Sequence, residues 1–213
     1  MKNLEAIIDR IHNDFETRTS ARDQALSHAR LLTRHCAHAI RAIHRNENDE
    51  AREKITEAHE LVDELTKNLV EHPDLYYAGY TQDALKEFAE ATITIALINN
   101  DNLPTPEELG VTYMTYVKGL AESAGELRRR TLDILRHGYS EDAERLLDHM
   151  DEIYASLVTM DYPDAITGGL RRLTDIVRGV TERTRGDMTL SIRQQRLEAQ
   201  LQKVEAMLSQ SES

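Results

Sequence analysis

The sequence predicts an all-α fold, a single bundle of seven helices that extends over residues 1–213. Apolar side chains recur in steps of three and four along almost the whole chain, which is the spacing of one face of a helix. No run of β-branched residues alternates with polar ones, so no strand is predicted. A chain of 213 residues is long enough to bury a substantial core.

Three apolar stripes predict helices in the first third of the chain, and we expect each stripe to face the core. The residue before Pro73 avoids the helical region, so the third stripe should end there. Cys36, the only cysteine, rules out an intramolecular disulfide or a thiolate zinc cluster and is expected to be a small core residue. The stripes are Leu4, Ile8, Ile11 and Phe15; Leu26, Ala29, Leu32, Cys36, Ile40 and Ile43; and Ile55, Ala58, Val62, Leu65 and Leu69.

Two further helices are predicted in the middle of the chain, on either side of a loop. The first covers residues 81–98 and ends at a polar cluster, residues 99–102, which leads into two prolines. Thr105 and Pro106 suit the cap and first position of a short helical turn that ends at Gly110. A long helix then covers residues 112–136 and stops at Gly138, a preferred residue just beyond a helix end.

The last third of the chain predicts three more helical segments. Ser140 opens the first, and the stretch 161–164 ends it at a proline. A regular stripe from Ile166 to Val180 forms the second, and a break is expected at Gly186 and Asp187. The final helix is expected to face the core or, alternatively, an oligomer interface. Its apolar residues are Leu197, Leu201, Val204 and Leu208.

The net charge of the chain disfavours some classes of function. A formal net charge of −12 argues against general binding of polyanions, although arginines gather in three basic segments, 20–45, 128–130 and 165–185. Each basic segment is either a solvated helix face or a local surface for an anionic ligand. Charges interrupt the N-terminal residues every few positions, which is typical of neither a signal peptide nor a membrane span. We therefore expect a cytoplasmic protein with no membrane partner.

Two pairs of glutamates at helical spacing are the strongest candidates for a functional site. Glu87 and Glu90 lie three residues apart, Glu122 and Glu126 lie four apart, and Glu90 is the only charged residue from 88 to 98. A carboxylate in such a setting is costly without a partner, and a divalent cation would supply one. Two helices packed side by side could direct all four carboxylates to one point.

The second helix of the site is unusually rich in small residues. Gly119 and Gly125 lie inside it, although a glycine in a helix costs about 0.5–1 kcal/mol relative to alanine. A close approach to the helix that carries Glu87 and Glu90 would justify that cost. Cations flank the glutamates and could hold a phosphate ester over the metal. They are Lys118, Arg129 and Arg130.

Alternatives from composition and spacing stay open at this point. The glutamates could be solvated helix positions in ordinary ion pairs, Lys86 with Glu90 and Glu126 with Arg130. A ferritin-like di-iron site is disfavoured because no glutamate has a histidine three residues later. The all-α nucleoside triphosphate pyrophosphatases pair a Glu-x-x-Glu with a Glu-x-x-Asp. Glu87 and Glu90 match the first half, whereas no Glu-x-x-Asp begins at Glu122 or Glu126.

These stretches resemble the translin superfamily. The run KEFAEA, a loop with prolines and then YVKGLAESAGELRRR occur in the order of that family, and the resemblance is to translin-associated factor X, its catalytic branch. The stretch SARDQALSHARLLTRHCAHAIRAIHR is similar to the first long helix of the family. The resemblance covers roughly the whole chain and implies a translin-type seven-helix bundle that assembles into a hollow octamer with its active sites facing inward.

The resemblance also implies a reaction. Glu87, Glu90 and Glu126 match acidic positions of the factor X motif, and Glu122 stands where the family usually has aspartate. By similarity these residues bind Mg²⁺, with Mn²⁺ as the alternative, and support endonucleolytic cleavage of single-stranded RNA with water as the nucleophile. A homo-octamer is the expected assembly. The competing hypotheses are a non-catalytic translin-like scaffold, which binds single-stranded nucleic acid through its arginines without metal, and the pyrophosphatase.

Overall fold

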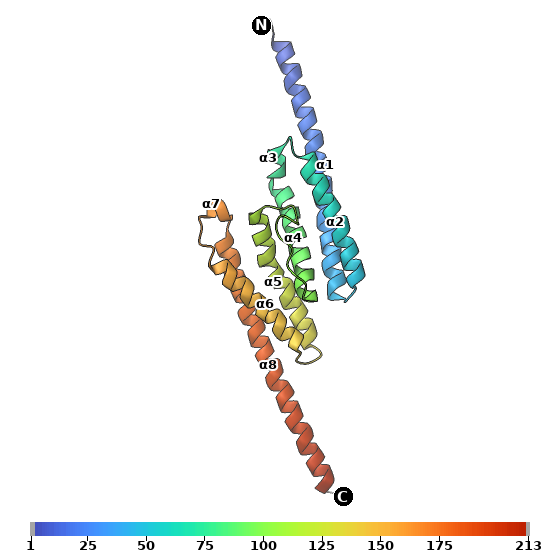
Figure 1. Cartoon of the computed structure of the whole chain (residues 1–213), viewed down its shortest axis with the longest axis vertical. Coiled ribbons are helices and arrows are strands. Elements are labelled where there is room, and N and C mark those ends of the chain that lie inside the picture. Colours follow the sequence, from blue (N-terminus) through green and yellow to red (C-terminus); the bar gives the residue numbers. More distant parts are fainter. Residues whose placement is uncertain (1–2, 212–213) are drawn as a thin grey trace. The chain divides into compact units, whose positions relative to one another are not determined.

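The structure, a computed structural model, describes residues 3–211, which form helices joined by loops, without a strand (Figure 1). This confirms the predicted fold class. Six long helices and two single-turn helices follow one another along the chain. They are α1 (Leu4–His44), α2 (Asn48–Asn68), α3 (Pro73–Tyr76), α4 (Gly79–Asn99), α5 (Tyr113–Leu135), α6 (Glu141–Val158), α7 (Asp164–Thr167) and α8 (Leu170–Ser211).

The chain divides into two compact units, whose boundaries fall inside α4 and α5. One unit comprises Met1–Ile95 with Leu103–Gly119, and the other comprises Ala96–Asn102 with Leu120–Ser213. Each of the two shared helices is continuous through the boundary. The assignment of residues 1–213 to a single domain stays a prediction.

The core of the first unit lies where α1, α2 and α4 present their small and branched apolar residues. A three-residue link joins α1 to α2, and Asn46 within it adopts the left-handed conformation that asparagine tolerates. The ring of His59 on α2 lies 5.4 Å from that of Phe88 on α4, centroid to centroid. Cys36 is fully buried, as expected for a core residue. Fully buried neighbours in this unit include Leu32, Leu85 and Phe88.

The second unit is held together by apolar contacts and ion pairs between α5, α6 and α8. Met188 of α8 packs with Leu147 of α6 in one buried cluster. Arg128 of α5 donates to the hydroxyl of Thr184, 3.0 Å away, and pairs with Asp187 at 2.8 Å. The first arginine of the predicted basic segment 128–130 therefore stabilises the fold.

The break expected at Gly186 and Asp187 is wrong, because α8 is one continuous helix through both residues. Residues that flank Gly186 hold the helix in place. Arg185 pairs with Asp151 of α6 at 2.6 Å. Asp187 pairs with Arg128, and Met188 is buried. These contacts outweigh the roughly 1 kcal/mol by which a glycine weakens a helix. The stripe predicted from Ile166 also begins later, at Leu170, because Gly168 and Gly169 adopt positive φ after α7.

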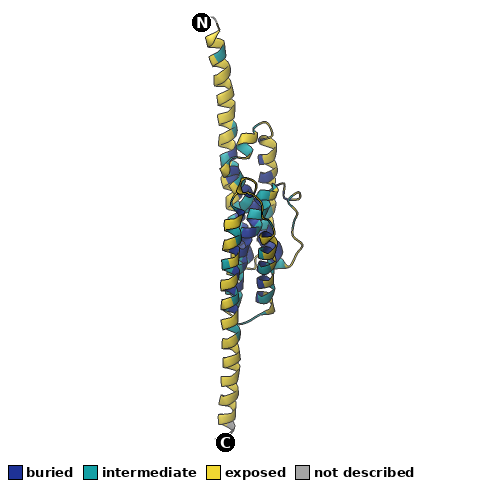
Figure 2. Cartoon of the chain, turned by 90° about the vertical axis from the view of Figure 1, so that its left-hand side faces the viewer, coloured by how far each residue is buried: buried dark blue, intermediate teal, exposed yellow. Residues whose placement is uncertain are grey.

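The expectation that every apolar stripe faces the core is wrong at both ends of the chain. The N-terminal part of α1 and the C-terminal part of α8 are exposed along their length (Figure 2). Phe15 is 62% exposed and Leu197 is 60% exposed. No helix within residues 3–211 buries either stripe, so the oligomer-interface alternative remains a prediction. Among the helices of residues 3–211, none is both long enough and apolar enough to cross a membrane.

Candidate metal centre

Helix α4 presents two carboxylates at the edge of a buried face. Glu87 and Glu90 are half-buried, while Phe88, Ala89 and Ala91 between and beside them are fully buried. A spacing of three residues places both glutamates on one side of the helix. The buried apolar residues therefore hold α4 in the core. The two carboxylates lie beside the surface that α5 approaches.

A glycine brings α5 unusually close to α4. A Cβ atom built on Gly119 would lie 2.8 Å from the Cβ of Ala89 and from the backbone nitrogen of Glu90. It would also lie 3.1 Å from the carbonyl oxygen of Lys86. Any residue larger than glycine would force the helices apart. This is the close approach predicted from the small residues of α5, although Gly125 has nothing within 4 Å of its Cβ position and contributes nothing to it.

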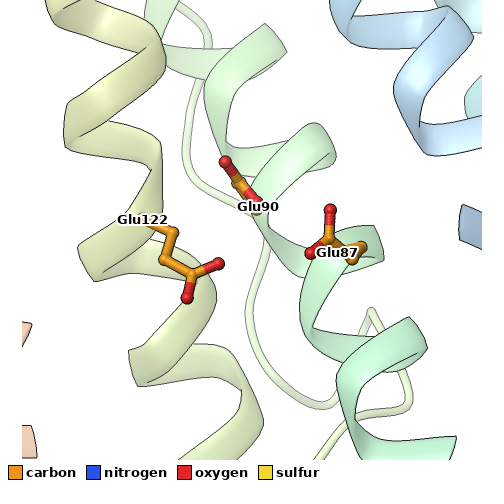
Figure 3. A group of neighbouring side chains, drawn as sticks. All are labelled: Glu87, Glu90 and Glu122. Carbon is orange, nitrogen blue, oxygen red and sulfur yellow. The ribbon is translucent and has the colours of Figure 1, made fainter. Parts of the chain in front are cut away.

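Three glutamates come together where these helices meet. Glu122 lies three residues after Gly119 in the same unbroken helix, so the contact at Gly119 sets its distance from α4. One carboxylate oxygen from each of Glu87, Glu90 and Glu122 lies within 4.8 Å of the others. All three are half-buried, and the side chain of Glu122 extends toward α4 (Figure 3). Within residues 3–211 this is the one group of three or more acidic, histidine or cysteine side chains with that proximity.

The structure does not place Glu126 in this group. It lies one turn beyond Glu122 on α5, and its carboxylate is 3.6 Å from a guanidinium nitrogen of Arg129. Of the other predicted site residues, Lys118 and Arg130 are half-buried and Arg129 is half-exposed. The functional roles of these four residues stay predictions.

One residue beside the glutamates was not among the predicted site residues. The ammonium of Lys86 lies 3.2 Å from a carboxylate oxygen of Glu87, and the Lys86 side chain is only 17% exposed. The sequence offered one indication of this residue, because Lys86 directly precedes Glu87. An ion pair of Lys86 with Glu90 was one of the alternatives from spacing, and the structure places the largely buried ammonium of Lys86 beside Glu87.

The negative charges of Glu87 and Glu90 affect a buried thiol in the core of the first unit, that of Cys36. Burial raises the pKa of the Cys36 thiol on α1, and the negative charges of Glu87 and Glu90 raise it further. A thiol in this position stays protonated and offers no thiolate to a metal. The donors of the site are therefore carboxylate oxygens, which suit a hard cation such as Mg²⁺.

The spacing of the donors fits such an ion. Oxygen ligands of Mg²⁺ lie about 2.0–2.1 Å from the metal, so two of them on opposite sides are about 4.2 Å apart. The three glutamate oxygens lie within 4.8 Å of one another. Rotations of the flexible glutamate side chains can bring oxygens within this upper bound to ligand distance. The residues present fit a small divalent cation with water completing its coordination.

Comparison with known proteins places the chain in a family. No protein-family model matches it. It is 34% identical over 201 residues to the uncharacterized protein MJ0175 of Methanocaldococcus jannaschii, covering 93% of this chain and 88% of that protein. Two solved structures of the C3PO protein of Archaeoglobus, one of them in complex with duplex RNA, are each 31% identical with a TM-score of 0.80. They cover 86% of this chain and 95% and 96% of theirs.

A more distant relative has the same fold. The apo structure of a protein named NeC3PO matches with a TM-score of 0.80 at 20% identity, over 86% of this chain and 96% of that one. The likeness thus persists where few residues are shared, and it extends over nearly the full length of each solved chain. By its fold and its relatives, this chain belongs to the translin superfamily.

Proposed function

We propose that this protein is a Mg²⁺-dependent endoribonuclease that cleaves single-stranded RNA as a homo-oligomer. The observation that carries the proposal is the group of Glu87, Glu90 and Glu122, whose oxygens lie within 4.8 Å of one another on two closely packed helices. The similar Archaeoglobus protein has been solved with duplex RNA, which supports RNA as the ligand class.

In this proposal the three glutamates hold the cation. A bound Mg²⁺ lowers the pKa of water and neutralises charge on a phosphodiester. Glu126, one turn beyond Glu122, is proposed to complete the set through water or after release from Arg129. Mn²⁺ has the same preference for oxygen ligands and is expected to substitute.

Lys86 has a proposed role in balancing charge. Three carboxylates carry three negative charges, and a divalent ion leaves one, which the ammonium of Lys86 beside Glu87 cancels while Glu126 stays paired with Arg129. A neutral centre does not repel an incoming phosphate, whereas a centre with a remaining negative charge would. Lys118, Arg129 and Arg130 are proposed to contact neighbouring phosphates of the strand, where a cation also contributes to binding.

Assembly of several copies is the second part of the proposal. The stripes of α1 and α8 leave Leu4, Ile8 and Phe15 and Leu197, Leu201 and Leu208 exposed. Continuous apolar stripes of this kind are typical of protein interfaces rather than of solvated helices. We propose that these exposed stripes are buried between copies in a homo-oligomer, and the predicted octamer is the specific form to test.

The decisive experiment combines cleavage with metal binding. Purified protein is incubated with labelled single-stranded RNA in Mg²⁺ and in EDTA, and Mn²⁺ binding is measured by calorimetry. Glu90→Gln should abolish cleavage and weaken Mn²⁺ binding, and Glu126→Gln should abolish cleavage, both with an unchanged circular dichroism spectrum. Glu60→Gln, on the exposed side of α2, is the matched control.

Three outcomes would replace the proposal. Full cleavage by Glu126→Gln or in EDTA would contradict the metal mechanism. RNA binding without cleavage in any divalent metal would instead indicate a non-catalytic scaffold. Release of pyrophosphate from a nucleoside triphosphate would indicate a pyrophosphatase. Light scattering of the same sample measures the assembly.

A further inference from the structure

A cavity in the first unit adjoins the carboxylate group. It measures about 370 Å³ and lies between α1 and α4. Its apolar lining comes from Leu26 and Ala29 of α1 and from Ala84 of α4. Tyr80, one turn before Ala84, contributes an aromatic ring. Ligand pockets are commonly about 300–1,000 Å³ and largely apolar, so this cavity has the size and lining of a small-ligand site.

Polar groups without a protein partner surround this lining. Arg30, Thr33 and Asp83 also line the cavity and are exposed to solvent, and within residues 3–211 none of their side chains takes part in an ion pair or hydrogen bond. Within the described residues, the phenol oxygen of Tyr80 is buried without a hydrogen-bond partner. The cavity therefore offers one cation, one carboxylate and an aromatic ring to a ligand.

The cavity and the carboxylate group share a residue. Glu87 lines the cavity and is also one of the three clustered glutamates. Tyr80 lies seven residues, two helical turns, before Glu87 and therefore on the same side of α4. A ligand in the cavity would consequently extend directly to the place where the proposal above puts a phosphate.

We propose that this cavity is a nucleobase subsite, which receives one unpaired base of the RNA strand beside the phosphate that is cleaved. This inference rests on the proposed function. The ring of Tyr80 supplies a stacking surface, Asp83 can accept a hydrogen bond from an exocyclic amino group, and Arg30 can contact the ribose phosphate backbone. Because a base in a duplex is stacked and paired, only a base turned out of the strand can enter.

A binding measurement tests the subsite without relying on cleavage. Adenosine 5′-monophosphate and uridine 5′-monophosphate are titrated against the full chain by saturation-transfer nuclear magnetic resonance, with and without Ca²⁺. We expect wild-type protein to bind at least one nucleotide through its base protons. Tyr80→Leu should weaken binding about tenfold or more, the range that stacking on an aromatic ring supplies, while Tyr80→Phe stays within about threefold.

Two further variants keep this test informative. Tyr77→Leu changes a neighbouring tyrosine that is 66% exposed and does not line the cavity, and it should bind as wild type. Thr33→Trp places a bulky ring at an exposed position of the cavity wall without altering the core, and it should block binding. If Tyr80→Leu fails to fold, Thr33→Trp decides. Unchanged nucleotide binding in Thr33→Trp, or no binding by wild type at millimolar nucleotide, would overturn the subsite.

Cleavage of abasic RNA separates this inference from the proposed function. A single abasic residue is moved along a labelled single strand, and the cut sites are mapped in Mg²⁺. We expect cleavage at the phosphate beside the abasic residue to fall about tenfold or more, with other cuts unchanged, and duplex RNA to be cut poorly. Cleavage that ignores the abasic residue would refute the subsite and leave the nuclease intact. Absence of all cleavage would refute the nuclease, and the nucleotide titration would then judge the cavity alone.

Discussion

Gly119 of α5 lies so close to α4 that a Cβ atom on it would stand 2.8 Å from the backbone nitrogen of Glu90. Atoms this close cannot coexist, so the distance between the two helices depends on the missing side chain. Glu90 and Glu122, the latter three residues after Gly119, lie on either side of that contact. The separation of the proposed ligands is therefore set by one glycine.

Gly119→Ala should push α5 away from α4 and separate the carboxylates. We expect a loss of about 1–3 kcal/mol in unfolding free energy from overpacking, because the new methyl group meets backbone atoms that cannot move aside. Affinity for Mn²⁺ should fall about tenfold or more, as changes around metal ligands typically produce. Thermal unfolding and calorimetric titration measure the two effects.

Gly125→Ala is the matched control in the same helix. Nothing lies within 4 Å of a Cβ atom at that position, so only helix propensity changes. The control should gain up to about 1 kcal/mol and keep its Mn²⁺ affinity. Equal behaviour of the two variants would show that the close contact has no role in the site.

Substitutions of Glu122 test the proposed ligand at which this chain has glutamate and the family usually has aspartate. Glu122→Asp keeps the carboxylate and shortens its reach by one methylene, so Mn²⁺ binding and RNA cleavage should persist at a reduced level. Glu122→Gln removes the charge at the original length and should abolish both. Parallel titrations and cleavage assays compare the pair. Strong metal binding by Glu122→Gln would exclude this residue as a ligand.

Arg145 should prove important for the end of α4. Its guanidinium donates to the carbonyl oxygens of Leu97 at 2.8 Å and Ile98 at 3.1 Å, in the last turn of α4, where carbonyls run short of backbone donors. The Leu97 carbonyl also accepts from the backbone N–H of Asn100 at 3.3 Å. Arg145→Gln should lose about 1.5–3 kcal/mol of unfolding free energy, because these bonds come from a charged group in a half-buried place.

Arg171→Gln provides the comparison for Arg145. The pair of Arg171 and Asp161 is exposed, with both side chains more than 80% accessible. Exposed pairs of this kind contribute about 0–1 kcal/mol. Denaturant unfolding of the two variants should therefore differ clearly, and a loss in Arg171→Gln as large as in Arg145→Gln would contradict the capping role.

The thiol of Cys36 should be unreactive in the folded protein. Its pKa is raised, first by burial and then by the charge of Glu87, so the folded state favours the protonated thiol. A raised acid pKa contributes stability below the pKa of the unfolded thiol, and this contribution is lost as the pH rises above that value. A thiol reagent at pH 8 should react only after denaturant unfolds the chain. Rapid reaction with native protein would contradict the burial of this residue.

Glu57 should make the first unit sensitive to acid. Its pKa is lowered, chiefly by the hydrogen bond from Lys54 at 2.9 Å, and also by His35, whose ring nitrogen lies 2.7 Å from the carboxylate. A lowered carboxyl pKa gives stability that is present above the unfolded value and lost as the pH falls through the folded one. Glu57→Gln should therefore lower the thermal midpoint at pH 7 and have no effect once Glu57 is protonated. An equal drop in the thermal midpoint at pH 7 and at a pH where Glu57 is protonated would refute this prediction.

Much of the fold could be predicted because helices follow from local periodicity. The ends of α4 and α5 were placed within two residues, since proline, glycine and polar clusters act on their immediate neighbours. Gly186 shows the limit of such rules. It resembles a break in the sequence, yet Arg185 and Asp187 beside it pair with α6 and α5 and keep the helix continuous.

Part of the candidate site could also be predicted from the sequence. Spacing identified Glu87, Glu90 and Glu122 because helical geometry puts residues three or four apart on one face. It could not tell that Glu126 lies outside the three-carboxylate group beside Arg129, or that Lys86 turns toward Glu87, because both depend on side-chain contacts.

The sequence by itself determined the all-α class, the order of the helices, the acidic pairs and the small residues that let α5 approach α4. Only the tertiary structure decided which apolar stripes are buried, that Gly119 rather than Gly125 makes the contact, and that a cavity beside Glu87 contains Tyr80. The physical reason is the range of the interactions. Periodicity and capping act over one or two turns, whereas burial and ligand spacing depend on residues that are distant in sequence and adjacent only after folding.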